Sequence, residues 1–156
     1  MTKTTWTRKD VSEITGIPDR RLLFYSEQNV IPGFIEKKTV GRGTPRSYSI
    51  EDIFYLMLIR ELDALGLSLA RIKSVIIFLH VMKHQELWVN GRFTKEEKIM
   101  IISLQPRHHT AAEGTQAHKE EFDMTWVSGS STIKMTADRP SMIVVNLNEI
   151  FKKAGI

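Results

Sequence analysis

The first pattern of apolar and polar residues along the chain predicts a short helix over residues 8–15. Thr7 and Asp10 have the spacing of a capping box, in which each side chain bonds the backbone N–H of the other residue. Val11 and Ile14 then share one face of the helix. Gly16 ends the pattern, because glycine readily takes the left-handed conformation that is common after a helix.

A second helix is predicted just beyond this glycine. Pro18 suits the turn before the helix or its first position, and Asp19 places a negative charge near the helix N-terminus. Residues 22–26 supply an amphipathic pattern, which the segment 29–33 breaks. Two short helices joined by a tight turn have the outline of a helix-turn-helix. The residues expected to anchor the second helix in the core are Leu22, Leu23, Phe24, Val30 and Ile31.

The next segment predicts a β-hairpin. Residues 34–37 and 46–48 are strand-like and flank a glycine-rich tip. The hairpin has few apolar residues, so it has no obvious core of its own. It carries four cationic residues, which are Lys37, Lys38, Arg42 and Arg46. A wing that approaches DNA phosphates needs this arrangement, because the helices supply the core.

Two strongly patterned helices follow the hairpin. Ser49 or Glu51 opens the first, which carries a broad apolar stripe up to Gly66. Ser68 caps the second, whose apolar stripe extends to Leu79. Both stripes predict faces that pack into the core, and we attach no ligand or cofactor to them.

The pattern changes from helical periodicity to alternation near His84. Strand candidates follow at residues 86–94, 98–104, 122–128, 132–136 and 141–147, and a last short helix is predicted over residues 147–154. The second half is therefore predicted to be a small antiparallel β-rich domain with a terminal helix. The expected fold class is α+β, with a winged helix-turn-helix domain at residues 1–80 and the β-rich domain at residues 81–156.

The composition, 42% hydrophobic and 26% charged, is typical of a soluble globular chain. The longest apolar run, residues 75–79, is far too short to cross a bilayer, and the N-terminal residues contain no apolar signal core. We therefore expect a cytoplasmic protein without a membrane partner. The absence of cysteine excludes disulfides, thiolate metal sites and cysteine nucleophiles.

The formal net charge of +4 and the isoelectric point near 9.4 suit an anionic partner. Most of the excess lies in the first half of the chain. There it gathers at Arg20 and Arg21, at the start of the second helix, and again in the hairpin. This distribution favours contact with nucleic acid through the helix-turn-helix and the wing.

Residues 6–80 resemble the DNA-binding domain of the MerR family of transcription regulators, which are winged helix-turn-helix proteins that bind operator DNA as dimers. Four pieces carry the resemblance in the right order: DVSEITGIP, LLFYSEQNVIP, TPRSYSIEDI and LDALGLSLARIKSVI. The resemblance implies a homodimer that places two recognition helices on a near-palindromic site in double-stranded DNA. RNA polymerase at the promoter and a small-molecule effector are further candidate partners.

The resemblance also implies roles for individual residues of the recognition helix. Arg20 matches a frequently basic position, Arg21 adds a second cation, and Tyr25 matches an aromatic that reaches the DNA backbone. Family members usually carry an arginine where this chain has Leu23. The doubled arginine earlier in the helix therefore takes more of the predicted DNA contact.

In the wing, Arg46 and Tyr48 match the arginine of the family and the tyrosine that follows it, and Pro45 replaces a more usual aromatic. Together with the recognition helix, these matches complete the predicted DNA-binding set. The set comprises Arg20, Arg21, Tyr25, Lys37, Lys38, Arg42, Arg46 and Tyr48.

The second half departs from the long dimerisation helix that is standard in the family. Three roles are open for it: dimerisation through strand edges, an effector pocket, or the docking of a partner protein. We favour dimerisation. An excisionase-like or architectural DNA-bending protein is the alternative function, but such proteins are often only the winged domain, so the additional residues favour a regulator.

Metal binding and catalysis are not expected. His80 and His84 stand four apart on a helix, a spacing that can place two imidazoles on one metal, whereas the other histidines lie in a polar stretch without periodicity. The sequence has no glycine-rich phosphate loop that opens a helix and no nucleophile elbow. We therefore predict no cofactor, no metal and no enzymatic activity.

Overall fold

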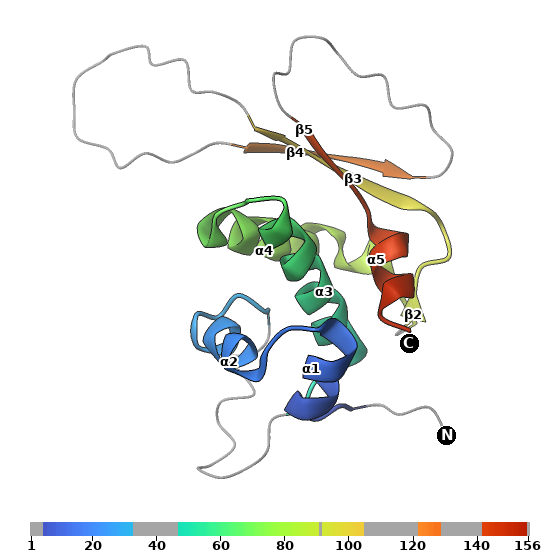
Figure 1. Cartoon of the computed structure of the whole chain (residues 1–156). Coiled ribbons are helices and arrows are strands. Elements are labelled where there is room, and N and C mark those ends of the chain that lie inside the picture. Colours follow the sequence, from blue (N-terminus) through green and yellow to red (C-terminus); the bar gives the residue numbers. More distant parts are fainter. Residues whose placement is uncertain (1–4, 33–46, 91, 105–121, 129–141, 156) are drawn as a thin grey trace, which may run out of the picture. The chain divides into compact units, whose positions relative to one another are not determined.

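The structure is a computed structural model of the chain, and it describes residues 5–32, 47–90, 92–104, 122–128 and 142–155 (Figure 1). The chain divides into two compact units. The first contains Met1–Thr94 together with Glu149–Ile156, and the second contains Lys95–Asn148. Within the described ranges, no helix combines the length and the apolar character needed to cross a membrane.

Helix α1 (Arg8–Thr15) begins and ends as its sequence predicts. Oδ2 of Asp10 accepts from the Thr7 backbone N–H at 2.8 Å, and Oγ1 of Thr7 accepts from the Asp10 N–H at 3.3 Å, so the capping box is complete. Gly16 follows with φ of 68°. A Cβ at this position would lie 3.3 Å from Nη1 of Arg60, which also donates a hydrogen bond to the Thr15 carbonyl. Glycine therefore serves both the turn and the close approach of α3.

Helix α2 (Asp19–Glu27) begins directly after Pro18. Its inner face buries Leu22, Tyr25 and Ser26. The helix ends at Glu27, and two residues later the φ of 52° at Asn29 turns the chain so that the Val30 N–H donates to the Tyr25 carbonyl at 3.1 Å. The helix-turn-helix predicted from the sequence is thus present as two short helices separated by a three-residue turn.

Helices α3 (Ile50–Ala64) and α4 (Leu69–Leu87) form the centre of the first unit. Ser49 opens α3 through a second capping box, with Asp52 as its partner, and Ser68 caps α4 by accepting from the Arg71 N–H. Every residue from position 52 to 59 is buried, so α3 is covered on all sides over these two turns. Continuous burial of this kind explains why α3 is apolar around most of its circumference.

A short hairpin and the end of the last helix close the first unit around Phe54 of α3. Strands β1 (Trp88–Val89) and β2 (Arg92–Phe93) form a short hairpin, and α5 (Leu147–Lys153) returns from the end of the chain. The Phe54 ring lies 5.1 Å from that of Phe93 and 6.4 Å from that of Phe151, between ring centres. The rings of Phe93 and Phe151 stack at 4.4 Å with only 9° between their planes. The hairpin and the end of α5 therefore belong to the first unit. The domain boundary at residue 80 stays a prediction.

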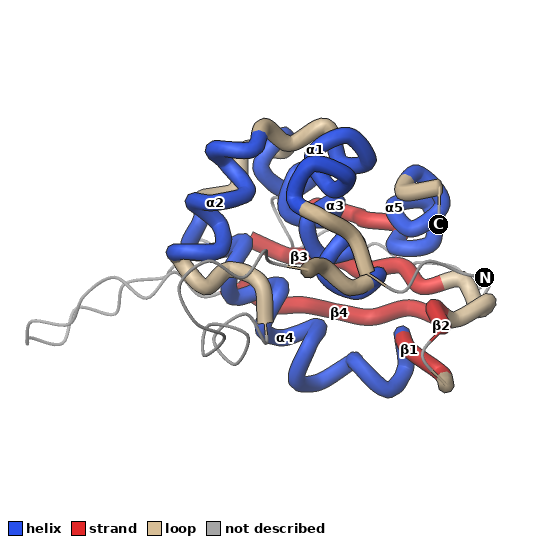
Figure 2. The backbone as a smooth tube through the Cα atoms, turned by 90° about the horizontal axis from the view of Figure 1, so that it is seen from below, coloured by secondary structure: helices blue, strands red, loops and turns tan. Residues whose placement is uncertain are grey.

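The second unit contains an antiparallel sheet in the order β4-β3-β5. Strand β3 (Lys98–Leu104) lies between β4 (Phe122–Ser128) and β5 (Met142–Asn146), and Figure 2 shows β3 and β4 side by side. The register places Met100 opposite Trp126 on one side and opposite Val145 on the other. These three strands and α5 were predicted within one or two residues. The predicted strand at residues 132–136 lies outside the described residues.

Candidate nucleic-acid interface

The outer face of α2 is the exposed surface of the helix-turn-helix. Arg20, Phe24 and Glu27 are exposed there, at the second, sixth and last positions of the helix. Residues three or four apart on a helix lie on the same face, so these side chains form one stripe that begins with a cation. The stripe is opposite to the buried face that holds Leu22.

Arg20 and Arg21 have different surroundings, although the sequence suggests an equivalent pair. Nη2 of Arg21 donates to both carboxylate oxygens of Asp63 on α3, at 3.0 and 2.9 Å. The Arg21 guanidinium also lies 5.7 Å from the centre of the Tyr25 ring. Among the described residues, Arg20 has neither an ion pair nor a side-chain hydrogen bond. Arg20 is therefore the cation of this pair that is available to an external phosphate or base.

The neighbouring acidic residue, Asp19, is also engaged. Its carboxylate lies 2.7 Å from Nε of Arg8 on α1. This ion pair joins the first turns of the two helices and neutralises the one carboxylate directly before Arg20. An anion that approaches Arg20 therefore meets less local repulsion than the sequence alone would suggest.

Tyr25 and Tyr48, both predicted to meet DNA, lie in the core of the first unit. Only 3% of the Tyr25 surface and 1% of the Tyr48 surface is exposed. Burial raises the pKa of the Tyr25 hydroxyl, and the nearby Arg21 partly offsets this rise in pKa. Tyr48 pairs with Trp6 through two backbone hydrogen bonds of 2.9 Å and so ties the N-terminal segment to the start of α3. A DNA contact by either hydroxyl stays a prediction.

The apolar residues of α2 differ from expectation at Phe24. The sequence suggests that this ring anchors the helix, yet 43% of its surface is exposed. Leu22 and Tyr25 instead fill the inner face, and Leu23 is half-buried at the edge. Leu22 to Tyr25 form a run of four consecutive apolar or aromatic residues, which necessarily spans more than one face of a helix. At least one of them had to point outward.

The wing cations of the predicted set lie outside the described residues. These are Lys37, Lys38, Arg42 and Arg46. Their contact with DNA stays a prediction from the sequence.

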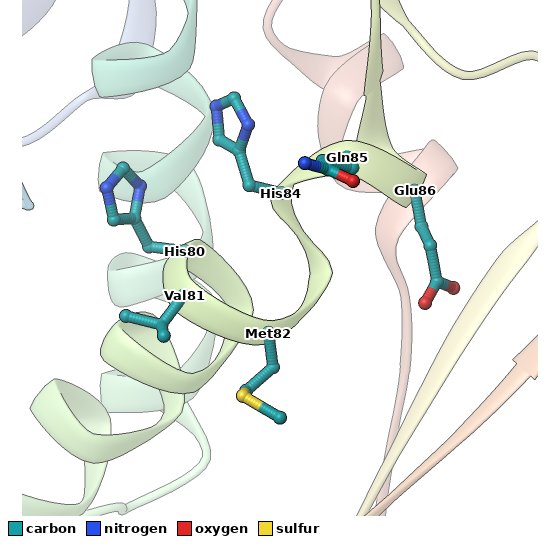
Figure 3. A pocket seen from close by; sticks show the side chains of 6 residues that line it. All are labelled: His80, Val81, Met82, His84, Gln85 and Glu86. Atoms are coloured by element: carbon teal, nitrogen blue, oxygen red, sulfur yellow. The ribbon is translucent and has the colours of Figure 1, made fainter.

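Polar and apolar residues from the last turns of α4 line a pocket: His80, Val81, Met82, His84, Gln85 and Glu86 (Figure 3). In Figure 3, the rings of His80 and His84 lie on the same side of α4, and Val81 and Met82 point away from them. The two rings are 5.4 Å apart between centres. Both histidines have partners on α3: Nε2 of His84 lies 3.2 Å from Oε2 of Glu51, and Nδ1 of His80 lies 3.5 Å from the Tyr55 hydroxyl oxygen.

These histidine contacts join α3 and α4. In the part of the chain that the structure describes, no three histidine or carboxylate side chains are grouped closely enough to hold a metal ion. Burial raises the pKa of the Tyr55 hydroxyl far above its ordinary value of 10.0, and Glu51 and Asp52 add to the effect. Tyr55 therefore remains a neutral hydrogen-bonding group near the histidines.

Comparison with known protein families identifies the N-terminal region. Residues 7–76 match the profile of the MerR HTH family regulatory protein. No curated protein matches the chain closely. The match spans the described helices α1, α2 and α3 and the first part of α4, which carry the exposed stripe with Arg20. The helix-turn-helix region of this chain is thus similar to that of the MerR family of regulators.

Proposed function

We propose that this protein is a sequence-specific transcription regulator of the MerR type. The observation that carries the proposal is the coincidence of the family match with an exposed arginine at the start of the second helix, which has no ion pair among the described residues. In helix-turn-helix proteins, the N-terminal residues of this helix contact base edges in the major groove. Arginine can grip the O6 and N7 atoms of guanine, which is the commonest specific contact.

The proposed complex contains two copies of the protein on a near-palindromic operator. Each copy contributes α2 to one major groove and a basic wing, with Arg46, to the flanking phosphates. The second unit is proposed to hold the dimer together, because β4 and β5 each have one neighbour in the described sheet and free strand edges pair readily. We propose further that the protein acts in the cytoplasm beside RNA polymerase, and that a small-molecule effector sets its activity.

Selection of bound duplexes from a random pool by the full chain tests this function. The expected result is an enriched motif with two inverted halves, bound by a protein dimer whose mass is measured by sedimentation. A protein that only bends DNA would retain duplexes without a consensus. If no motif is enriched and binding to duplex does not weaken with salt, the proposed function is wrong.

A further inference from the structure

Phe24 lies on the outer face of α2, away from the buried Leu22. Its ring is 43% exposed, and its described aromatic neighbour is Tyr25, at 6.0 Å between ring centres and tilted by 53°. Exposing an aromatic ring in water costs free energy that burial would recover, and Phe24 stands in the middle of a charged surface stripe. A single exposed ring is not unusual, but its position relative to Arg20 is informative.

Arg20 and Phe24 stand four residues apart, so they lie on the same face of α2, one helical turn from each other. Four residues of a helix rise by about 6 Å, and successive base pairs of DNA are separated by about 3.4 Å. When the N-terminal end of α2 lies in a major groove, the two side chains therefore reach bases no more than about two steps apart.

The two side chains select different chemistry. A guanidinium donates hydrogen bonds to guanine, whereas a phenyl ring has no polar group to offer to a base edge. The one apolar group exposed in the major groove is the C5-methyl group of thymine, and aromatic side chains are suited to contact it. A contact with phosphate would instead leave the ring without a partner.

We propose that Phe24 is a specificity-determining residue that reads the methyl group of a thymine lying within about two base pairs of the guanine contacted by Arg20. This proposal rests on the proposed function, since it requires α2 to enter the major groove. Glu27, the third exposed residue of the stripe, occupies the last position of α2, away from the N-terminal end that reads the bases.

The decisive reagent is uracil, which is thymine without the methyl group. Each thymine of the selected duplex is replaced in turn by uracil, and the dissociation constant is measured for the wild-type chain and for Phe24→Ala. The matched control is Val89→Ala, which removes exposed apolar atoms from β1, an element outside the helix-turn-helix. Circular dichroism checks that each variant is folded.

At one thymine position per half-site, uracil is expected to weaken wild-type binding about fourfold, the effect of exposing one methyl group. The same replacement is expected to leave the affinity of Phe24→Ala unchanged, and Val89→Ala is expected to behave like the wild type. The inference is overturned if uracil at no position weakens the binding of the wild-type chain. It is also overturned if the replacement lowers the affinity of Phe24→Ala as much as it lowers that of the wild type. A chain that selects no duplex at all would overturn the proposed function itself, which is a separate and recognisable outcome.

Discussion

Arg21 on α2 and Asp63 on α3 form an ion pair in which one guanidinium nitrogen, Nη2, lies within 3.0 Å of both carboxylate oxygens. The pair links the candidate recognition helix to the central helix of the first unit. It also withdraws one of two adjacent arginines from the candidate DNA-binding surface. The neighbouring Arg20 keeps its charge available, so the two arginines have distinct predicted roles.

Replacement of Asp63 by asparagine is expected to strengthen binding to duplex DNA of any sequence. The change removes a negative charge close to the candidate interface and releases the Arg21 guanidinium toward phosphates. Because both side chains of the pair are well exposed, stability is expected to change by less than about 1 kcal/mol. Fluorescence anisotropy with an unrelated duplex, over a range of salt concentrations, measures the effect.

The control for this variant is a double-mutant cycle with Arg21→Ala. Arg21→Ala is expected to weaken DNA binding more in the Asp63→Asn background than in the wild type, since only the released guanidinium reaches phosphate. Equal losses in the two backgrounds would show that Asp63 does not restrain Arg21.

Arg20→Ala and Arg46→Ala are expected to differ in kind. The first should change the preferred base at particular positions, with a cost of about 1–3 kcal/mol for the correct site. The second should weaken binding evenly across sequences and lower the salt slope by about one, as expected for a phosphate contact. Selection experiments and salt titrations with both variants separate these effects. Arg92→Ala, which removes an exposed cation from β2, serves as the control. If Arg20→Ala lowers the affinity equally for all DNA sequences, Arg20 contacts phosphate and does not read a base.

The helices of the first unit were largely predictable because their signals are local. The Thr7 and Asp10 capping box and Gly16 each act within a few residues, and both are found where the sequence places them. Of the two residues expected to open the third helix, Ser49 does so. The strands of the second unit were predictable for a similar reason, since alternation of side chains is a local pattern.

The surroundings of the site residues could not be predicted in the same way. Asp63 is 42 residues from Arg21, and no local pattern indicates their pairing. Four consecutive apolar or aromatic residues in α2 leave the choice of inward face to the tertiary packing, so the exposure of Phe24 and the burial of Tyr25 were both missed. The return of α5 to the first unit depends on aromatic contacts with Phe54 and Phe93, which are distant in the sequence.

The first unit is expected to lose stability at alkaline pH, and Tyr55 is expected to contribute to the loss. Its folded-state pKa is raised far above 10.0, so above pH 10 the unfolded chain releases a proton that the folded chain retains. The contribution of Tyr55 to the free energy of unfolding is fully present below pH 10. Above pH 10 it falls as pH rises, by up to about 1.4 kcal/mol per pH unit. Tyr55→Phe should flatten the dependence, as measured by urea unfolding at pH 8 and pH 10.5. If the free energy of unfolding changes equally with pH in the wild type and in Tyr55→Phe, this role is contradicted.

Phe151→Ala is expected to release the end of α5 from the first unit. The half-buried Phe151 ring stacks on Phe93, and its removal should lower the free energy of unfolding by about 2 kcal/mol. Hydrogen exchange should become faster at residues 149–153. Lys152→Ala, a change at an exposed residue of the same helix, should alter stability by less than about 0.5 kcal/mol. Unchanged exchange in Phe151→Ala would show that the stacked rings do not hold α5.

The most direct test of sequence-specific DNA recognition is the ratio of two dissociation constants. The full chain is titrated against its selected duplex and against a scrambled duplex of the same composition, at one fixed salt concentration. A specific regulator should bind the selected duplex at least about 1,000-fold more tightly. A ratio near one, across the range of salt concentrations in which binding is measurable, would contradict the assignment of this protein as a sequence-specific regulator.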